Sequence, residues 1–193
     1  MAALSQRILT GLGTALSALL CVLAPWLRWP GMELLGVSPD WPLMWVVCWS
    51  LRRTPWQGTV AGLGMGMLQD GLSAPEPTHM MSLAVVGFLT ARLQKQRYMQ
   101  EDFISIALII FGMVVIAETL RALQWSLMTL FLSTWDLDLI SFSGDALPSL
   151  STIWATHQRV TLSSAILSSL WGPALHLPLR TWWDRERAGD GVE

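Results

Sequence analysis

The sequence predicts an all-α protein, a polytopic membrane helix bundle with about six spans. Hydrophobic residues make up 52% of the 193 positions and charged residues only 13%, about half the charged share of a soluble domain. Mean hydropathy is +0.45, and several apolar runs approach the roughly 20 residues that a transmembrane helix needs. The basic residues lie mostly at the ends of these runs, as positive-inside topology requires.

The apolar runs fall within one integral membrane domain over residues 1–183. The first run lacks a small-x-small cleavage pattern and continues into Pro25, so we expect an uncleaved span. The second run is short: eleven residues from Trp41 to Leu51 cover only about 16 Å, which leaves its crossing open. The polar segment 184–193 is expected to be a disordered cytoplasmic tail. The predicted spans lie near residues 8–27, 41–51, 56–74, 79–93, 103–125 and 160–183.

The distribution of basic residues favours six crossings with both termini cytoplasmic. With six spans, nine of the twelve Lys and Arg residues fall on one side of the membrane, which the positive-inside rule assigns to the cytoplasm. Only Arg28 and Arg159 lie on the opposite side, and Arg121 lies inside a span. The net charge of −2 and the scattered basic residues give no indication of a nucleic-acid partner.

Two groups of residues outside the spans are candidates for contacts. Apolar and aromatic side chains in the outer loop 133–158 indicate a segment that lies in the membrane interface or contacts a partner; they include Trp135, Leu137, Phe142 and Trp154. Cytoplasmic basic residues suit anionic lipid or an acidic partner surface, although topology alone explains their charge; they are Arg52, Arg53, Arg92, Lys95 and Arg97.

A stripe of small residues runs along the third span. Gly58, Gly62, Gly66 and Asp70 recur every fourth residue, so three positions without side chains and a carboxylate share one helix face. Small residues allow a neighbouring helix backbone to approach closely in lipid. We therefore expect a helix-packing seam, whose neighbour is a helix of this chain or one of a partner.

Three ionisable residues are expected at similar depth in the membrane. Asp70 lies about fifteen residues from the cytoplasmic end of its span, and Glu118 and Arg121 lie fifteen to eighteen residues into theirs. A charge at this depth costs about 3 kcal/mol on insertion scales, so pairing is expected. Glu118 and Arg121 can pair at a spacing of three, and Asp70 could join Arg121. The favoured interpretation is a polar contact that fixes helix register, with partner or ligand binding as the alternative.

No set of residues indicates catalysis, a metal or a cofactor. Ser73 follows a glycine, but it precedes a proline-rich turn and no histidine is placed to activate it. The three histidines lack the spacing of a metal-binding pair. The glycine-rich segment 62–66 follows no strand and precedes no Lys-Ser/Thr, so helix packing explains it better than phosphate binding. The protein is therefore not expected to be an enzyme.

The order of features from Pro39 to Arg97 resembles the rod shape-determining protein MreD family. The residues that carry this resemblance are the run Ser38-Pro39-Asp40-Trp41-Pro42, the short apolar span ending in Arg52-Arg53, the glycine-rich helix closing on Leu68-Gln69-Asp70-Gly71-Leu72-Ser73-Ala74-Pro75, and the next span ending in Arg92. The rest of the chain resembles the family by span count and topology only.

The resemblance implies a non-catalytic, multi-pass protein of the bacterial inner membrane, part of the elongation machinery that controls cell shape. It implies binding to the bitopic scaffold MreC and coupling of cytosolic MreB filaments to the peptidoglycan polymerase and transpeptidase. The family also resembles the substrate-binding S-components of energy-coupling-factor transporters in fold. A vitamin-uptake protein with a ligand pocket near Asp70 and Arg121 is therefore the alternative function.

Overall fold

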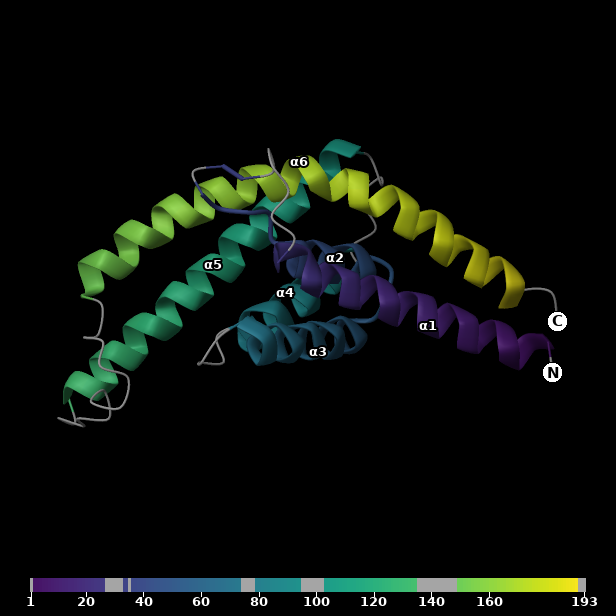
Figure 1. Ribbon diagram of the computed structural model, residues 1–193, viewed down its shortest axis with the longest axis horizontal. Coiled ribbons are helices and arrows are strands. Elements are labelled where there is room, and N and C mark those ends of the chain that lie inside the picture. Colours follow the sequence, from purple (N-terminus) through teal and green to yellow (C-terminus); the bar gives the residue numbers. More distant parts are fainter. Residues whose placement is uncertain are drawn as a thin grey trace.

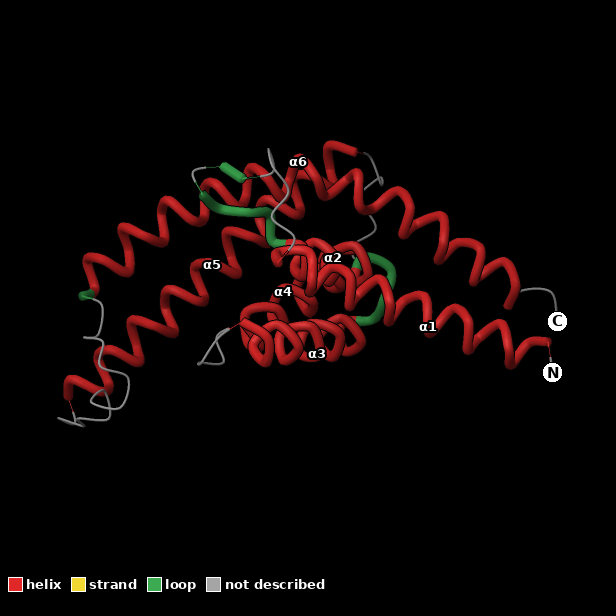
Figure 2. The backbone as a smooth tube through the Cα atoms, viewed as in Figure 1, coloured by secondary structure: helices red, strands yellow, loops and turns green. Residues whose placement is uncertain are grey.

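The computed structural model describes residues 2–26, 33–34, 36–73, 79–94, 103–134 and 149–190. Over these ranges the chain is helical with no strand, as the sequence predicts (Figures 1 and 2). Its elements are α1 (Ala2–Leu23), the short 3₁₀ helix η1 (Ala24–Trp26), α2 (Trp41–Ser50), α3 (Pro55–Ser73), α4 (His79–Gln94), α5 (Phe103–Thr134) and α6 (Leu150–Asp190).

The short helix α2 lies in the core of the bundle. It has no polar face, and eight of its ten residues are buried, as expected for a helix that is apolar all round. Side chains of α2 such as Leu43 and Val47 pack in one cluster with α5 side chains such as Ile110 and Val114. The indole Nε1 of Trp45 donates a hydrogen bond of 3.0 Å to Ser17 Oγ, which ties α1 to this core.

Helices α5 and α6 pack side by side and together extend beyond the body formed by α2, α3 and α4, toward the left in Figure 1. We call residues 122–134 of α5 and 150–160 of α6 the arm. At about 1.5 Å per residue, the 32 residues of α5 span about 48 Å, well above the roughly 30 Å thickness of a bilayer core. A helix of this length is long enough to cross the bilayer core with residues to spare.

The structure corrects the predicted boundaries of the outer loop. The sequence predicted a loop over residues 133–158, whereas α5 continues to Thr134 and α6 already begins at Leu150. The first turns of α6 are rich in Ser, Thr, His and Gln, so they carry no apolar run that would mark a helix. The predicted tail at 184–193 is likewise helical as far as Asp190.

One helix among the described residues is both long and apolar enough to cross a membrane by length and composition. It covers Phe103–Phe131, with a mean hydropathy of 2.5. Shorter apolar helices cover Gly11–Trp26 and His79–Leu93. Each of the six expected spans overlaps one helix, and among the described helices α5 alone is long and apolar enough to cross a membrane on its own.

The first turns of α1 and the last turns of α6 lie at the same end of the molecule, opposite the arm (Figure 1). A contact near this end joins the two helices: a side chain added at Gly13 would meet the ring of Trp182. Pro173 and Pro178 lie inside α6, where proline removes backbone hydrogen bonds and favours a bend. The helix arches over the rest of the bundle (Figure 1).

Candidate functional site

The centre of the bundle holds an ion-pair cluster around Arg121. Its Nη2 atom lies 3.0 Å from Asp40 Oδ2 and 2.9 Å from Glu118 Oε1. The three side chains are largely buried, with 16% of the Arg121 side chain, 8% of Asp40 and 10% of Glu118 exposed. We call these three residues the central cluster. The structure thus contains the Glu118–Arg121 pair expected from their spacing of three, together with a second carboxylate.

Asp40 was not among the residues predicted for this cluster, and it has a second role. Its Oδ1 accepts a hydrogen bond of 3.1 Å from the backbone N–H of Leu43, so Asp40 caps the N-terminus of α2. Its own backbone N–H donates to Ser168 Oγ at 3.0 Å. Through Asp40, the central cluster joins the start of α2 to α5 and to α6. The sequence signal for the capping role is an aspartate directly before Trp41-Pro42, because aspartate is a typical N-cap residue and proline is favoured in the first turn of a helix.

Asp70 does not join Arg121, and that expectation was wrong. Its Oδ1 accepts hydrogen bonds from the His79 backbone N–H at 3.0 Å and lies 2.8 Å from His79 Nδ1. Its Oδ2 accepts from the Met80 backbone N–H at 3.0 Å. The first N–H groups of a helix lack partners within the helix, and a carboxylate there also meets the positive end of the helix dipole. Asp70 therefore closes the α3–α4 hairpin.

The glycine stripe of α3 packs against α4 of the same chain. A Cβ at Gly62 would meet the carbonyl oxygen of Leu83, and a Cβ at Gly66 would meet the backbone of Met80. Gly58 faces Gly87, and each would clash with the other's carbonyl oxygen if it carried a side chain. The neighbour in the predicted seam is thus a helix of this chain, and Gly87 is the member that sequence reasoning missed.

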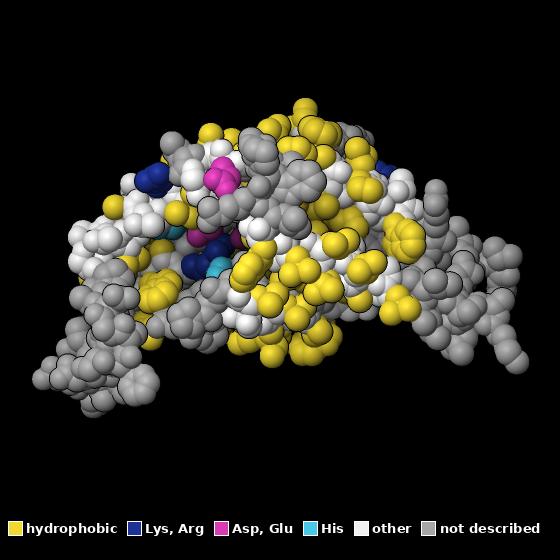
Figure 3. Space-filling view, viewed as in Figure 1, with side chains coloured by type: hydrophobic (Ala, Val, Ile, Leu, Met, Phe, Trp, Pro, Cys, Tyr) yellow, Lys and Arg dark blue, Asp and Glu magenta, His cyan; other side chains and the backbone are white. Residues whose placement is uncertain are grey.

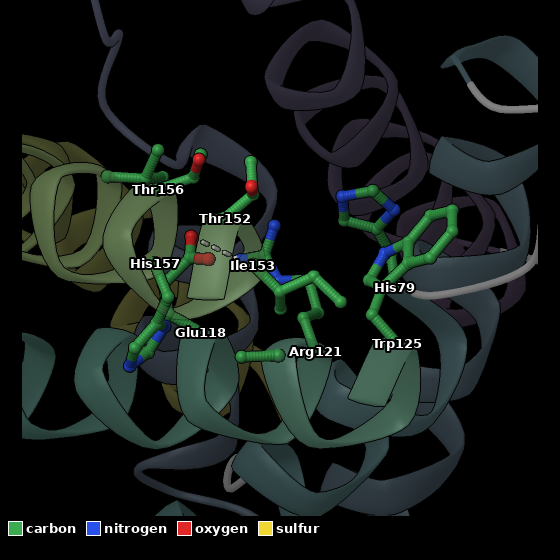
Figure 4. A pocket seen from close by; sticks show the side chains of 10 residues that line it. His79, Glu118, Arg121, Trp125, Thr152, Ile153, Thr156 and His157 are labelled. Carbon is green, nitrogen blue, oxygen red and sulfur yellow. Dashed lines mark ion pairs between the residues drawn. The ribbon is translucent and has the colours of Figure 1, made fainter. Parts of the chain in front are cut away.

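A cavity of about 360 Å³ lies between α5, the first turns of α6 and the start of α4 (Figure 4). Glu118 and Arg121 of the central cluster form part of its wall, His79 and His157 line it from two different helices, and apolar and hydroxyl side chains complete it. In the space-filling view, basic, acidic and histidine side chains are visible inside a hollow on this face (Figure 3). The remaining lining residues are Ala122, Trp125, Thr152, Ile153, Thr156 and Val160.

A second cavity, of about 180 Å³, lies next to the first. Glu118, Arg121 and Val160 line both cavities. The smaller one also contacts Asp40 and the prolines that precede α2. Two residues of the central cluster therefore line both cavities, whereas Asp40 lines only the smaller one. Such convergence of a few polar groups in a largely apolar hollow is typical of binding sites.

The predicted cytoplasmic residues are only partly within the described residues. The Arg53 guanidinium lies 5.1 Å from the centre of the Trp49 ring, and that of Arg92 lies 5.9 Å from the Phe88 ring, both within the range of cation–π contacts. Arg52 is half-buried. Lys95 and Arg97 lie outside the described residues.

The residues predicted for the outer loop also lie only partly within the described part of the chain. Trp135, Leu137 and Phe142 lie outside the described residues. Trp154 lies on α6, in the arm, with 41% of its surface exposed and its ring edge-on to His157 at 5.3 Å. His157 Nδ1 lies 3.0 Å from Thr161 Oγ1, and partial burial lowers the pKa of His157 below its ordinary value. Its imidazole is therefore neutral at pH 7.

The described side chains bring together no catalytic set. No group of three or more His, Cys, Asp or Glu side chains among them is placed to hold a metal ion. The Ser73 side chain is outside the described part. The charged groups of the central cluster bond to one another and to helix ends, an arrangement that fixes helices relative to each other.

Comparison with known proteins assigns the family. Neither curated proteins nor solved structures give a match, so the expected resemblance to energy-coupling-factor S-components is not supported. The family model of rod shape-determining protein MreD matches residues 5–157 of the 193-residue chain. This match covers α1 to α5 and the first turns of α6, including all three residues of the central cluster. The chain therefore belongs to the MreD family of membrane proteins, whose role is rod shape determination.

Proposed function

We propose that this protein is a multi-pass, non-catalytic scaffold of the bacterial elongation machinery, with both termini cytoplasmic. In this role it binds MreC and couples cytosolic MreB filaments to the peptidoglycan polymerase and transpeptidase. The match to the MreD family carries the proposal. Two features of the molecule support it: a body fixed by internal polar contacts, and an arm that projects from that body.

The body has the contacts that a scaffold needs to hold its surfaces in fixed positions. Arg121 joins α5 to the start of α2, and Ser168 joins the same point to α6. Asp70 closes the α3–α4 hairpin, and the glycine seam brings these two helices into close contact. The position of the arm relative to α2, α3 and α4 is thereby set inside the molecule.

The arm carries large apolar side chains that are partly exposed. Position 127 lies 24 residues beyond Phe103, about 36 Å along α5, past the roughly 30 Å of hydrocarbon that an upright helix crosses. Apolar groups beyond the hydrocarbon are typical of a protein contact. We assign the MreC contact to this surface, formed by Leu127, Leu130, Phe131, Leu150 and Trp154, all exposed.

The glycine seam of α3 is not the proposed MreC contact, because α4 of the same chain already packs against it. A substitution at Gly62 would thus affect MreC only through the stability of the body. The arm and the seam are separable features, and variants of each should behave differently. This difference gives the proposal a direct test.

Co-purification from membranes tests the assignment of MreC to the arm. The full chain is co-expressed with MreC, and MreC recovery is compared for the wild type, for the double variant Phe131→Ala/Trp154→Ala and for the control Leu12→Ala/Leu16→Ala. The control truncates two apolar side chains of α1 that are 62% and 57% exposed, against 59% for Phe131 and 41% for Trp154. We expect at least a tenfold loss of MreC for the arm variant only. Undiminished recovery with the arm variant would refute the assignment.

A further inference from the structure

The larger cavity presents balanced charges to a ligand. The two charged side chains that α5 contributes to its wall, Glu118 and Arg121, form an ion pair of 2.9 Å. His79 lies 2.8 Å from the carboxylate of Asp70, and the imidazole of His157 is neutral at pH 7 because burial lowers its pKa. An ion that entered the cavity would have to separate an existing pair or lose hydration without compensation. The cavity therefore favours an uncharged ligand.

Hydroxyl groups in the same wall disfavour a hydrocarbon chain as the ligand. Thr152 and Thr156 lie four residues apart, so they share one face of α6, and both are exposed and line the cavity. The Thr152 hydroxyl lies 2.8 Å from Ser149 Oγ. A hydroxyl has one donor and two acceptor positions, so it can bond a ligand as well. Hydrocarbon would cover these groups without offering them a hydrogen bond, which is costly. We therefore expect a ligand with polar, uncharged groups.

An aromatic ring forms another side of the cavity. Trp125 of α5 is half-buried, and in Figure 4 its indole lies beside His79, on the other side of the view from Thr152 and Thr156. The negative face of an indole attracts C–H groups, which carry a small positive charge. A sugar ring has C–H groups on its faces and hydroxyl groups around its edge. It therefore matches an aromatic ring on one side and hydroxyl side chains on the other.

We propose that the larger cavity binds an uncharged sugar ring, packed on Trp125 and hydrogen-bonded through its hydroxyl groups to Thr152 and Thr156. The cavity volume of about 360 Å³ suits a small ligand, since it lies at the lower end of the roughly 300–1,000 Å³ that is typical of small-molecule sites. None of the five residues assigned to the MreC contact is among the described residues that line this cavity. The sugar site and the MreC contact are therefore independent proposals.

The depth of the cavity indicates two sources of the sugar. Glu118 lies about 22 Å and Trp125 about 33 Å along α5 from Phe103, at about 1.5 Å per residue. With Phe103 at one face of a hydrocarbon core about 30 Å thick, the Trp125 end of the cavity reaches the opposite headgroup layer. A sugar at this level either enters from the aqueous side or belongs to the headgroup of a glycolipid. Both sources present the same chemistry to the wall.

Saturation-transfer NMR of the full chain in phosphatidylcholine nanodiscs tests this proposal, with methyl β-glucopyranoside as the uncharged sugar. Glucosamine and glucuronate, which carry an ammonium and a carboxylate on the same ring, are titrated in parallel. We expect transfer to the ring protons of the glucoside and roughly tenfold weaker binding of both charged sugars, the factor for one uncompensated polar group. No transfer to the glucoside would overturn the proposal, and so would equal binding of the three sugars.

Variants of the wall locate the binding site. Trp125→Ala should abolish the transfer, and Thr152→Val/Thr156→Val, which keeps the side-chain shape, should raise the Kd of the glucoside about tenfold for two lost hydrogen bonds. The control Trp56→Ala removes an indole that is 75% exposed and lines neither cavity, and it should bind as the wild type does. Unchanged binding in the threonine variant would refute the site.

A glycolipid in the nanodiscs identifies the source of the sugar. Monoglucosyl diacylglycerol carries the same ring on a lipid, and it is added to the phosphatidylcholine before the glucoside is titrated. Displacement of the glucoside assigns the site to a glycolipid headgroup. Undiminished transfer to the glucoside assigns it to a soluble saccharide, and either result supports an uncharged sugar as the ligand.

Discussion

Arg121 of α5 and Asp40, which lie 81 residues apart in the chain, meet at 3.0 Å in the centre of the bundle. The same carboxylate caps α2 by accepting a hydrogen bond from the Leu43 backbone N–H. The backbone N–H of Asp40 donates a hydrogen bond to Ser168 Oγ of α6. One residue thus joins three helices. Because Arg121 also bonds Glu118, the contact combines a local pair with a long-range one, and its loss should affect both the stability and the shape of the molecule.

Removing the guanidinium should destabilise the fold. Arg121→Met leaves two largely buried carboxylates without a cation, a situation that costs about 3–5 kcal/mol in other proteins. Thermal unfolding in detergent measures the effect, with Arg92→Met as the control because Arg92 is exposed. The control should lose less than about 1 kcal/mol. Equal losses for the two variants would show that the central cluster does not stabilise the bundle.

The glycine seam gives a test within one helix. Gly62→Ala places a methyl group on the carbonyl of Leu83, so α3 and α4 must separate, with an expected cost of about 1–3 kcal/mol. Gly64→Ala meets nothing within 4 Å and should stabilise the helix by about 0.5–1 kcal/mol. Unfolding midpoints compare the two variants. Opposite signs are expected, and a stabilising Gly62→Ala would contradict the packing.

Asp70 should act as a helix cap for α4. Asp70→Ala removes the acceptor of the His79 and Met80 N–H groups, for an expected loss of about 1 kcal/mol and up to about 2 kcal/mol. Asp70→Asn keeps one acceptor oxygen and should lose less. Hydrogen exchange at the first turn of α4 reports the effect locally. Exchange rates there that do not change in Asp70→Ala would disprove the capping role.

The pH dependence of stability should include a contribution from His157. Burial lowers the pKa of this imidazole in the folded state, so the unfolded state binds more protons just below the ordinary pKa of about 6.5. Stability should therefore fall as the pH falls below about 6.5, and should be constant above it for this group. Unfolding between pH 5 and 8 should show a smaller slope in His157→Gln than in the wild type; an identical slope would refute the assignment.

The sequence was most informative where apolar runs are long and uninterrupted. These runs located all six helices, and the Glu118–Arg121 spacing indicated a pair that the structure contains. The short helix α2 was left undecided because its length is unusual for a span. Eight of the ten residues of α2 are buried, so this helix lies at the centre of the body among the other helices.

The sequence was less informative where a contact depends on tertiary structure. Asp70 was assigned to Arg121 by depth, but the turn that brings α4 back places the His79 and Met80 N–H groups closer. The contact of Asp40 with Arg121 was not predicted, since no local spacing links two residues that lie 81 positions apart. The first turns of α6 were assigned to a loop because their Ser and Thr residues resemble one by composition.

The most direct test of the account is the shape of cells that lack their own MreD-family protein and express this chain. At equal abundance in the membrane, the wild type and Gly64→Ala should restore rod shape, whereas Phe131→Ala/Trp154→Ala should leave the cells round. The central claim is that a body fixed by the central cluster holds an arm for a partner. Rod-shaped cells with the arm variant, or round cells with the wild type, would contradict it.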